Sequence, residues 1–490
     1  MSTDYSRDTI FVGGEWAPTK GTGHIEAISP VTEEVIATVP SGSREDVDAA
    51  VAAARRAYDT GPWPRMSVAE RVDAVGRLRA AFERRKEDMA QAITAEMGSP
   101  ITQSRTIQTT VPLMMLDEQR EIALNTYPWS ELRQSASGNA LVRRYGKGVA
   151  ALITPWNAPM MTVIQKLGPA LISGCTVVLK PASLAPFSAY LLAELAQEAQ
   201  LPEGVLNVLT CDRAEAEYLV LHPGVNKVTF TGSTGAGRHL AAKCGELLRP
   251  ITLELGGKSA GIILDDADIP AAVEAMRLLS FRNSGQICTL KTRVLVSKKR
   301  ESEVVEALGQ MVASMPVGDP LDEATHIGPM VSEKQSDNVE RYIDIGIREG
   351  AQLVTGGLGR PDGLNQGWFV RPSLFAGVGP ESRLAQEEIF GPVLSVIAYD
   401  DEDDAIAIAN NSPYGLSGSV FSQDIERAIS VADRVKTGVL EINGAPFGFH
   451  APFGGVKESG IGRESGWEGF EPYVELKSIG LPKEYADSIA

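Results

Sequence analysis

Cysteine and histidine are scarce in this chain. Four cysteines occur in 490 residues, and none forms a Cys-x-x-Cys pair, so a secreted disulfide framework is excluded. The five histidines are scattered without the spacing of zinc ligands, and we expect no metal site. The cysteines are Cys175, Cys211, Cys244 and Cys288.

Long apolar runs and an excess of positive charge are also missing. The longest apolar stretches, at 149–153 and 176–179, are too short to span a bilayer, and the polar N-terminus leads into no signal core. Lys and Arg total 46 against 63 for Asp and Glu, which gives a net charge of −17. Nucleic acids and anionic membranes both require basic patches. We therefore expect a cytoplasmic protein with no nucleic-acid and no membrane partner.

The distribution of apolar residues predicts an α/β chain. At roughly 150 residues per domain, the length suggests about three packing units. Apolar residues recur at helical spacing after Ser43, whose partner Asp46 three residues later indicates a helix start. From about Leu141, short apolar segments alternate with helical ones, which favours a parallel sheet covered on both faces. A second alternation after Gly257 predicts a second domain of this kind. The expected strands are 148–153, 176–179, 205–209, 227–230, 260–264, 293–296, 351–354 and 393–396.

Three further local signals concern turns, a helix start and the tail. The segment 10–16 reads as a hairpin around Gly13 and Gly14, and the acidic run 400–404 as a solvated helix start. Residues 473–479 alternate like an exposed strand that could pair with another chain.

Glycine-rich segments raise two binding hypotheses. The first, 230–238, follows an expected strand and opens an expected helix, so its backbone N–H groups suit a phosphate. Its glycines read Gly-x-x-Gly-x-Gly, and a plain turn explains them equally well. The second, 256–259, fails the phosphate-loop pattern because Thr252 stands where the first glycine is required. A kinase or NTPase is therefore disfavoured.

Three polar residues are candidates for chemistry. Glu254 ends an apolar run, so its pKa should be raised as in a general base, although a ribose-binding acid or a structural ion pair fits equally. Cys288 follows a turn at Gly285, which suits a nucleophile as well as a buried packing residue. Asn157 lies between two prolines, as an oxyanion-binding amide or a simple turn former would.

Together, seven short blocks resemble the aldehyde dehydrogenase superfamily. Their order agrees over nearly the whole chain, including the 34 residues from Glu254 to Cys288. The resemblance implies an α/β fold with two Rossmann-like parallel-sheet domains and a small β oligomerisation arm. It implies a dinucleotide-binding domain at 1–124 and 146–256, a catalytic domain at 257–456, and an arm at 125–145 and 471–490. The blocks are 154–157, 179–182, 230–233, 253–258, 285–288, 387–392 and 452–455.

The resemblance also implies roles for the catalytic candidates. Cys288 would attack the aldehyde, and the Asn157 side chain with the Cys288 N–H would hold the oxyanion. Glu254 would activate the water that hydrolyses the resulting thioester, and Lys166 is implied as a further catalytic residue.

The implied cofactor is NAD and/or NADP. Many NAD-specific relatives carry Glu where Ser183 stands, and serine removes the repulsion of a 2′-phosphate, so we expect NADP to be accepted. The implied cofactor-binding residues are Ile153, Thr154, Pro155, Trp156, Lys180, Ser183, Gly232, Ser233, Gly256, Gln335, Glu388 and Phe390.

The substrate pocket implied by motif alignment is mostly apolar. It contains no Arg or Lys to anchor an acidic tail, which disfavours succinate semialdehyde. Phe447, Phe449 and Phe453 could form an aromatic cage for a quaternary ammonium, but Gln165 replaces the tryptophan of some relatives. We expect a medium-sized aliphatic or aromatic aldehyde. The implied pocket residues are Ala158, Met161, Thr162, Gln165, Ile287, Thr289, Phe447 and Phe453.

Two alternatives remain open from the sequence. A coenzyme A-acylating enzyme is disfavoured because such relatives typically lack the glutamate at Glu254. A non-catalytic NAD(P)-binding structural protein is disfavoured by the intact Cys288, Glu254 and Asn157. The resemblance also implies a homodimer or homotetramer.

Overall fold

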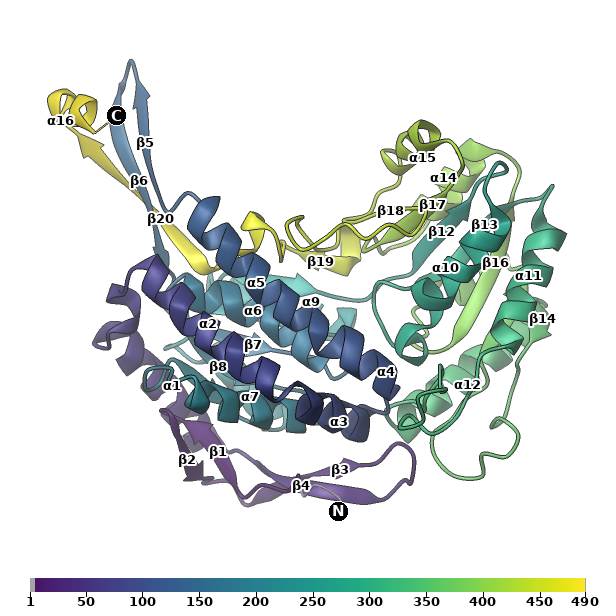
Figure 1. Cartoon of the computed structure of the whole chain (residues 1–490), viewed down its shortest axis with the longest axis horizontal. Coiled ribbons are helices and arrows are strands. Elements are labelled where there is room, and N and C mark those ends of the chain that lie inside the picture. The colour runs from purple at the N-terminus through teal and green to yellow at the C-terminus, as the bar shows by residue number, and fades with distance from the viewer. Residues whose placement is uncertain (1–4, 490) are drawn as a thin grey trace.

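Strand β7 (Val149–Ile153) shows why the N-terminal half folds in three layers. The computed structural model describes residues 5–489, and all five residues of β7 are buried. Because side chains alternate along a strand, Ala150 and Leu152 pack into one core while Val149, Ala151 and Ile153 pack into another. Helices cover both faces of the sheet as a result (Figure 1).

The helices of this half divide between the two faces. Helices α2, α3, α5, α6 and α7 contribute to the core with Ala150, and helices α1, α8 and α9 to the core with Val149. The predicted start of α1 is confirmed, since Ser43 and Asp46 form a reciprocal capping box. The bounds are α1 (Arg44–Asp59), α2 (Val68–Arg84), α3 (Lys86–Met97), α4 (Ile101–Gln103), α5 (Thr110–Asn125), α6 (Pro159–Ile172), α7 (Phe187–Glu198), α8 (Arg213–Leu221) and α9 (Thr234–Glu246).

The first large sheet is parallel at its centre and antiparallel at its edges. Strands β11, β10, β7, β8 and β9 run parallel, while the predicted N-terminal hairpin forms one edge and a short C-terminal strand, β19, forms the other. In sheet order the strands are β19 (Gly460–Ile461), β11 (Ile251–Glu254), β10 (Lys227–Thr231), β7, β8 (Thr176–Lys180), β9 (Leu206–Val208), β1 (Thr9–Val12) and β2 (Glu15–Pro18).

The second large sheet lies in the C-terminal half. All its pairs are parallel except that of β14, an antiparallel edge strand. Its order is β14 (Gln352–Thr355), β15 (Ser373–Ala376), β16 (Val393–Tyr399), β13 (Lys291–Ser297), β12 (Ser259–Ile263), β17 (Gly418–Phe421) and β18 (Glu441–Ile442). The helices here are α10 (Ile269–Phe281), α11 (Glu301–Ala313), α12 (Glu333–Arg348), α13 (Arg383–Gln386), α14 (Glu402–Asn410) and α15 (Ile425–Ala432). The predicted acidic helix start is confirmed, because Asp401 caps α14.

Two small sheets complete the fold. The tail strand β20 (Val474–Leu481) pairs antiparallel with β6 (Gly138–Gly146), which also pairs with β5 (Ser130–Ser135). One edge of β20 is therefore paired within its own chain, and the predicted pairing with another chain concerns its other edge. This sheet projects from the body beside α16 (Lys483–Ser488), and the hairpin of β3 (Gly23–Ile28) and β4 (Val35–Ser41) lies near the N-terminal end (Figure 1).

No helix within residues 5–489 is both long enough and apolar enough to cross a membrane.

Candidate active site

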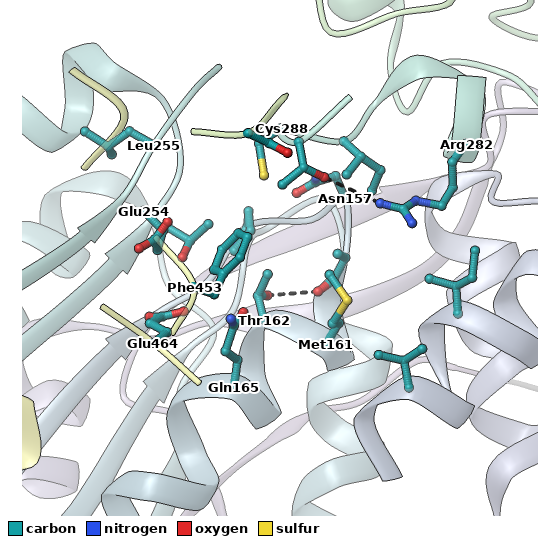
Figure 2. A pocket seen from close by; sticks show the side chains of 18 of the residues that line it. Asn157, Met161, Thr162, Gln165, Glu254, Leu255, Arg282, Cys288, Phe453 and Glu464 are labelled. Carbon is teal, nitrogen blue, oxygen red and sulfur yellow. Dashed lines mark hydrogen bonds between the residues drawn. The ribbon is translucent and has the colours of Figure 1, made fainter. Parts of the chain in front are cut away.

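A cavity of about 660 Å³ lies where the strands of the first sheet end and the Cys288 loop approaches them. It brings together residues from both halves of the chain. Cys288, Glu254 and Asn157 all line it, and Figure 2 shows their side chains around one space, with Phe453 between them and the helix that bears Gln165. Every implied substrate residue lines it: Ala158, Met161, Thr162, Gln165, Ile287, Thr289, Phe447 and Phe453.

The implied cofactor residues divide into two groups. Those that line the cavity are Pro155, Trp156, Gly232, Ser233, Gly256, Gln335, Glu388 and Phe390. Ile153, Thr154, Lys180 and Ser183 are not among the lining residues. They lie at the ends of β7 and β8, which are neighbours in the sheet, with Ile153 opposite Lys180.

The turn before Cys288 is strained and tightly held. Asn283, Ser284 and Gly285 have φ values of 51°, 57° and 79°, in the left-handed region. A Cβ on Gly285 would collide with the Gly391 backbone, so glycine is required there. The Asn283 N–H donates to Gln103 Oε1 at 2.7 Å, and the Ser284 hydroxyl accepts from a backbone N–H at 2.8 Å. These buried hydrogen bonds hold the strained backbone that presents the thiol.

Asn157 is fixed from three sides. Its Nδ2 donates to the Gln286 carbonyl at 2.9 Å, two residues before the thiol. The main-chain carbonyl of Asn157 accepts hydrogen bonds from Gln108 Nε2 and Asn283 Nδ2, both at 3.0 Å. One N–H of the Asn157 amide is thus used to join the loops, and the other remains for an oxygen in the cavity. Gln108, which the sequence analysis missed, ends a π-helical turn at Ser104–Gln108.

The surroundings of Cys288 disfavour the thiolate form of its side chain. Burial raises its pKa to about 12, and the carboxylates of Glu388 and Glu254 add to the shift, whereas the charge of Arg282 opposes it. A thiol with this pKa is a weak nucleophile at pH 7, because the thiolate is the reactive form. For Cys288 to act as a nucleophile, a base must remove its proton or an added positive charge in the cavity must lower its pKa.

Glu254 is a buried carboxyl group without a partner. It is 4% exposed, and neither side-chain oxygen has a hydrogen-bond partner within the described chain. Burial raises its pKa well above the ordinary value and the Glu464 carboxylate adds to this, while Lys166 and Arg463 oppose it. The structural ion-pair interpretation of Glu254 is therefore wrong, and the raised pKa suits a general base.

Lys166 lies behind the cavity wall, paired with a residue that the sequence analysis missed. Its Nζ is 2.8 Å from Glu464 Oε1, and the two side chains are 0% and 4% exposed. Glu464 lines the cavity and Lys166 does not. The partners are 298 residues apart, and no motif surrounds Glu464, so only the folded chain reveals the pair.

The other end of the cavity offers groups suited to a dinucleotide. The Glu388 carboxylate accepts from the Gly257 N–H at 2.9 Å, and burial raises its pKa to about 7. The α9 N-terminus opens here at Ser233, its N-cap. The Thr231 hydroxyl, at the end of β10, has no partner within residues 5–489. An acceptor carboxylate, a helix N-terminus and a free hydroxyl together fit ribose hydroxyls and a pyrophosphate.

Gln335 and Phe390 shape the wall at this end. The Gln335 side-chain amide donates to the main-chain carbonyls of Ile389 and Phe390 at 3.1 and 2.8 Å. These hydrogen bonds hold the backbone of that segment in place. Phe390 has a φ of 60° and meets the Trp156 ring edge-to-face at 5.6 Å.

The substrate end contains two features that the sequence analysis missed. One is an apolar wall from the π-helical turn and α5, formed by Ile107, Val111, Met114 and Met115. The other is Arg282, six residues before Cys288, whose side chain lines the cavity. The conclusion that the pocket lacks a basic group was therefore wrong. The closeness of Arg282 to Cys288 in the sequence was the signal that could have identified it as a pocket residue.

Comparisons with known proteins agree on one family. The model of the aldehyde dehydrogenase family matches residues 16–479. Geranial dehydrogenase of Castellaniella defragrans is 45% identical over 482 residues, which are 98% of this chain and 100% of that protein. A 3-succinoylsemialdehyde-pyridine dehydrogenase of a Pseudomonas species is 43% identical, over 96% of this chain and 98% of its own.

Two solved structures are also similar. An aldehyde dehydrogenase of Mycobacterium tuberculosis complexed with NAD+ has a TM-score of 0.96 and 43% identity, covering 98% of this chain and 99% of its own. A cysteine-to-alanine mutant of aldehyde dehydrogenase C from Pseudomonas syringae, complexed with NAD+ and octanal, has a TM-score of 0.94 and 41% identity, covering 98% of both chains.

Proposed function

The chain belongs to the aldehyde dehydrogenase family, and on that premise we propose that it oxidises a medium-sized aldehyde to the free carboxylic acid through a covalent intermediate on Cys288. The observation that carries this proposal is the meeting of Cys288, Asn157 and Glu254 in one cavity. A nucleophile, an oxyanion donor and a base with a raised pKa are the three groups that acyl transfer to water requires.

The proposed reaction uses these residues in two stages. After the Cys288 thiol has lost its proton to water in the cavity, its sulfur attacks the aldehyde carbon. The remaining N–H of the Asn157 amide and the Cys288 N–H stabilise the oxyanion of the hemithioacetal. Loss of a hydride then leaves a thioester. In the second stage Glu254 takes a proton from water, which attacks the thioester carbon and releases the acid and the thiol. Lys166 is paired with Glu464, and its positive charge opposes the rise in the pKa of Glu254.

NAD(P), when bound, supplies the hydride acceptor. We propose that Glu388 holds one ribose through Oε2, the carboxylate oxygen that the Gly257 N–H does not contact. Ser233 and Gly232 would hold the pyrophosphate at the α9 N-terminus. Lys180 and Ser183 would take the second ribose at the end of β8. The other contacts in this proposal are Ile153, Thr154, Pro155, Trp156, Gly256, Gln335 and Phe390. With serine at position 183, no carboxylate repels a 2′-phosphate, so NADP would be accepted.

The apolar walls of the cavity support an aliphatic or aromatic substrate. Met161, Ile287 and Phe453 lie near the nucleophile, and the α5 wall extends the apolar surface outward. The named relatives act on geranial and on a pyridine-bearing semialdehyde, and one similar structure holds octanal. These compounds have the size and the apolar body that this cavity favours.

We also propose a homodimer or homotetramer assembled through the projecting sheet. Tyr145 and Leu476, on two paired strands of this sheet, are 48% and 56% exposed and offer apolar surface to a second copy of the chain.

The test is formation of reduced nicotinamide over an aldehyde panel, with NAD and NADP in parallel and no coenzyme A. Turnover of apolar aldehydes with release of free acid supports the proposal. Activity that appears only when coenzyme A is added would show that thioester hydrolysis by Glu254 is the wrong assignment.

A further inference from the structure

A lysine beside the cofactor end of the cavity is buried without a hydrogen-bond partner. Lys258 directly precedes β12 and is 2% exposed, and within residues 5–489 its Nζ makes no hydrogen bond. Moving an ammonium group from water into the protein interior is unfavourable unless an acceptor or an opposite charge compensates for it. The stability of the fold therefore does not explain why a lysine occupies this position.

Lys258 belongs to a segment that surrounds the carboxylate of Glu388. The Gly257 N–H donates to Glu388 Oε1 at 2.9 Å. A Cβ on Gly256 would lie 2.2 Å from Glu388 Oε2, so glycine at this position leaves room for the carboxylate. The Ser459 hydroxyl donates to the Gly256 carbonyl at 2.7 Å and fixes the segment from its other side. The segment thus determines where the carboxylate lies.

The other charged groups that act on Lys258 have partners elsewhere. Glu387 forms an ion pair with Arg383 at 2.7 Å. Arg293 is also a cation, and its guanidinium donates to three main-chain carbonyls, that of Lys258 among them. In the described part of the chain, Glu388 is therefore the neighbouring carboxylate without a cationic partner of its own.

We propose that Lys258 is a positioning residue for the cofactor, whose positive charge keeps Glu388 ionised so that the carboxylate can accept hydrogen bonds from a ribose. This inference rests on the proposed function, in which Glu388 holds one ribose of NAD(P). An ionised carboxylate only accepts hydrogen bonds, whereas a protonated carboxyl group presents a donor in place of one acceptor. The charge state of Glu388 thus determines how well it can bind ribose hydroxyl groups.

Lys258 and Glu388 affect each other's protonation near neutral pH. Burial raises the pKa of Glu388 to about 7, while the Gly257 N–H and Lys258 oppose the rise. Burial lowers the pKa of Lys258 to about 7, and Arg293 adds to that shift whereas the carboxylates oppose it. Below this pH Lys258 is charged, so removing its charge should raise the pKa of Glu388. At clearly higher pH the effect should fade, because Lys258 is neutral there and Glu388 is ionised without it.

The other titratable groups that face the pair keep one charge state over this range. Burial raises the pKa of both Cys288 and Tyr414, which face Glu388, so both are mostly neutral near pH 7. Arg383 lowers the pKa of Glu387 to about 2, and burial lowers that of Arg293 to about 10. The expected pH dependence therefore belongs to Lys258 and Glu388.

The experiment measures the binding of reduced nicotinamide dinucleotide directly, by its fluorescence, at an acidic and an alkaline pH. It compares the unmodified full-length protein with Lys258→Met, Glu388→Gln and the double variant. A nearby opposite charge shifts a carboxyl pKa by about one unit or more, and each unit below the pKa reduces the ionised fraction about tenfold. Lys258→Met should therefore weaken binding about five- to tenfold at about pH 6 and less than about twofold at about pH 9. In the Glu388→Gln background it should add less than about a twofold change.

Thermal stability separates positioning from a structural role. Methionine resembles lysine in length but carries no charge, so Lys258→Met removes the cost of burying the ammonium group. At the acidic pH, the midpoint of thermal unfolding of the cofactor-free variant should stay the same or rise, although the variant binds the cofactor more weakly. Lys298→Met, at an exposed lysine paired with Asp400, is the control and should change neither quantity.

The outcomes separate this inference from the proposed function. A loss of affinity for Lys258→Met that is equal at both pH values, or that persists in the Glu388→Gln background, overturns the inference. Unchanged binding at the acidic pH also overturns it. If Lys258→Met does not fold, Lys258→Gln is compared in the same way and decided by the same results. If Glu388→Gln binds the reduced dinucleotide as tightly as the unmodified protein at both pH values, the proposed ribose contact of Glu388 is refuted instead.

Discussion

The buried pair of Lys166 and Glu464 predicts opposite effects for two substitutions next to Glu254. Lys166→Met removes a positive charge that lowers the pKa of Glu254, so that pKa should rise further. Glu464→Gln removes a negative charge that raises it and leaves Lys166 uncompensated, so that pKa should fall. A base must be ionised to act, and hydrolysis at a given pH should therefore slow in the first variant and persist to lower pH in the second.

The magnitude follows from the burial of the pair. Both side chains are almost fully buried, with 2.8 Å between Nζ and Oε1, so solvent screens them little. A charge within about 4–6 Å shifts a carboxyl pKa by about 1–3 units, and because Glu254 lies outside the 2.8 Å pair, the shift of its pKa should not exceed that range. Below its pKa, each unit reduces the ionised fraction of Glu254 roughly tenfold. Removing one partner of a buried pair also lowers stability by about 3–5 kcal/mol, so both variants should melt at lower temperature.

The assay is the pH dependence of acid release from the pre-formed thioester, which isolates the step that requires Glu254. The acidic limb should move to higher pH for Lys166→Met and to lower pH for Glu464→Gln. Movement of both limbs in the same direction, in variants that remain folded, would refute the electrostatic argument. Lys166→Arg serves as the control, since it keeps the charge and should leave the limb within about half a unit of its original position.

Three further predictions concern single positions. Asn157→Ala should lower kcat about 100- to 1,000-fold with little effect on alkylation of Cys288, measured by steady-state kinetics and mass spectrometry. Gly285→Ala should lower the thermal midpoint and the rate together, because its Cβ would strike the Gly391 backbone; an unchanged midpoint would contradict the assigned strain. Ser183→Glu should lower kcat/KM with NADP at least tenfold while changing the NAD value little, and equal loss with both cofactors would contradict the role of position 183.

Features that depend on neighbouring residues in the chain could be read from the sequence. The capping pair Ser43 and Asp46, the hairpin at Gly13 and Gly14, and the turn before Cys288 are all present, because each is a local backbone requirement. The motif blocks likewise indicated residues that meet in the cavity, since parallel strands present their carboxyl ends at one edge.

Features that depend on distant contacts could not be read in this way. Glu464 meets Lys166 across 298 residues, and no pattern around either residue announces the other. The π-helical turn that delivers Gln108 to Asn157 is likewise stabilised by tertiary contact. Arg282 was overlooked for another reason: its position was visible, but the lack of a partner for its guanidinium appears only when its surroundings are known.

The central claim, a thioester on Cys288 that Glu254 hydrolyses, is tested most directly by trapping it. Glu254→Gln is mixed with an aldehyde and NAD, and its intact mass is measured over time. The account predicts one acyl group per subunit, located on the Cys288 peptide, together with one equivalent of reduced nicotinamide and almost no further turnover. Turnover by Glu254→Gln at the rate of the unmodified protein, or an acyl group on another residue, would contradict it.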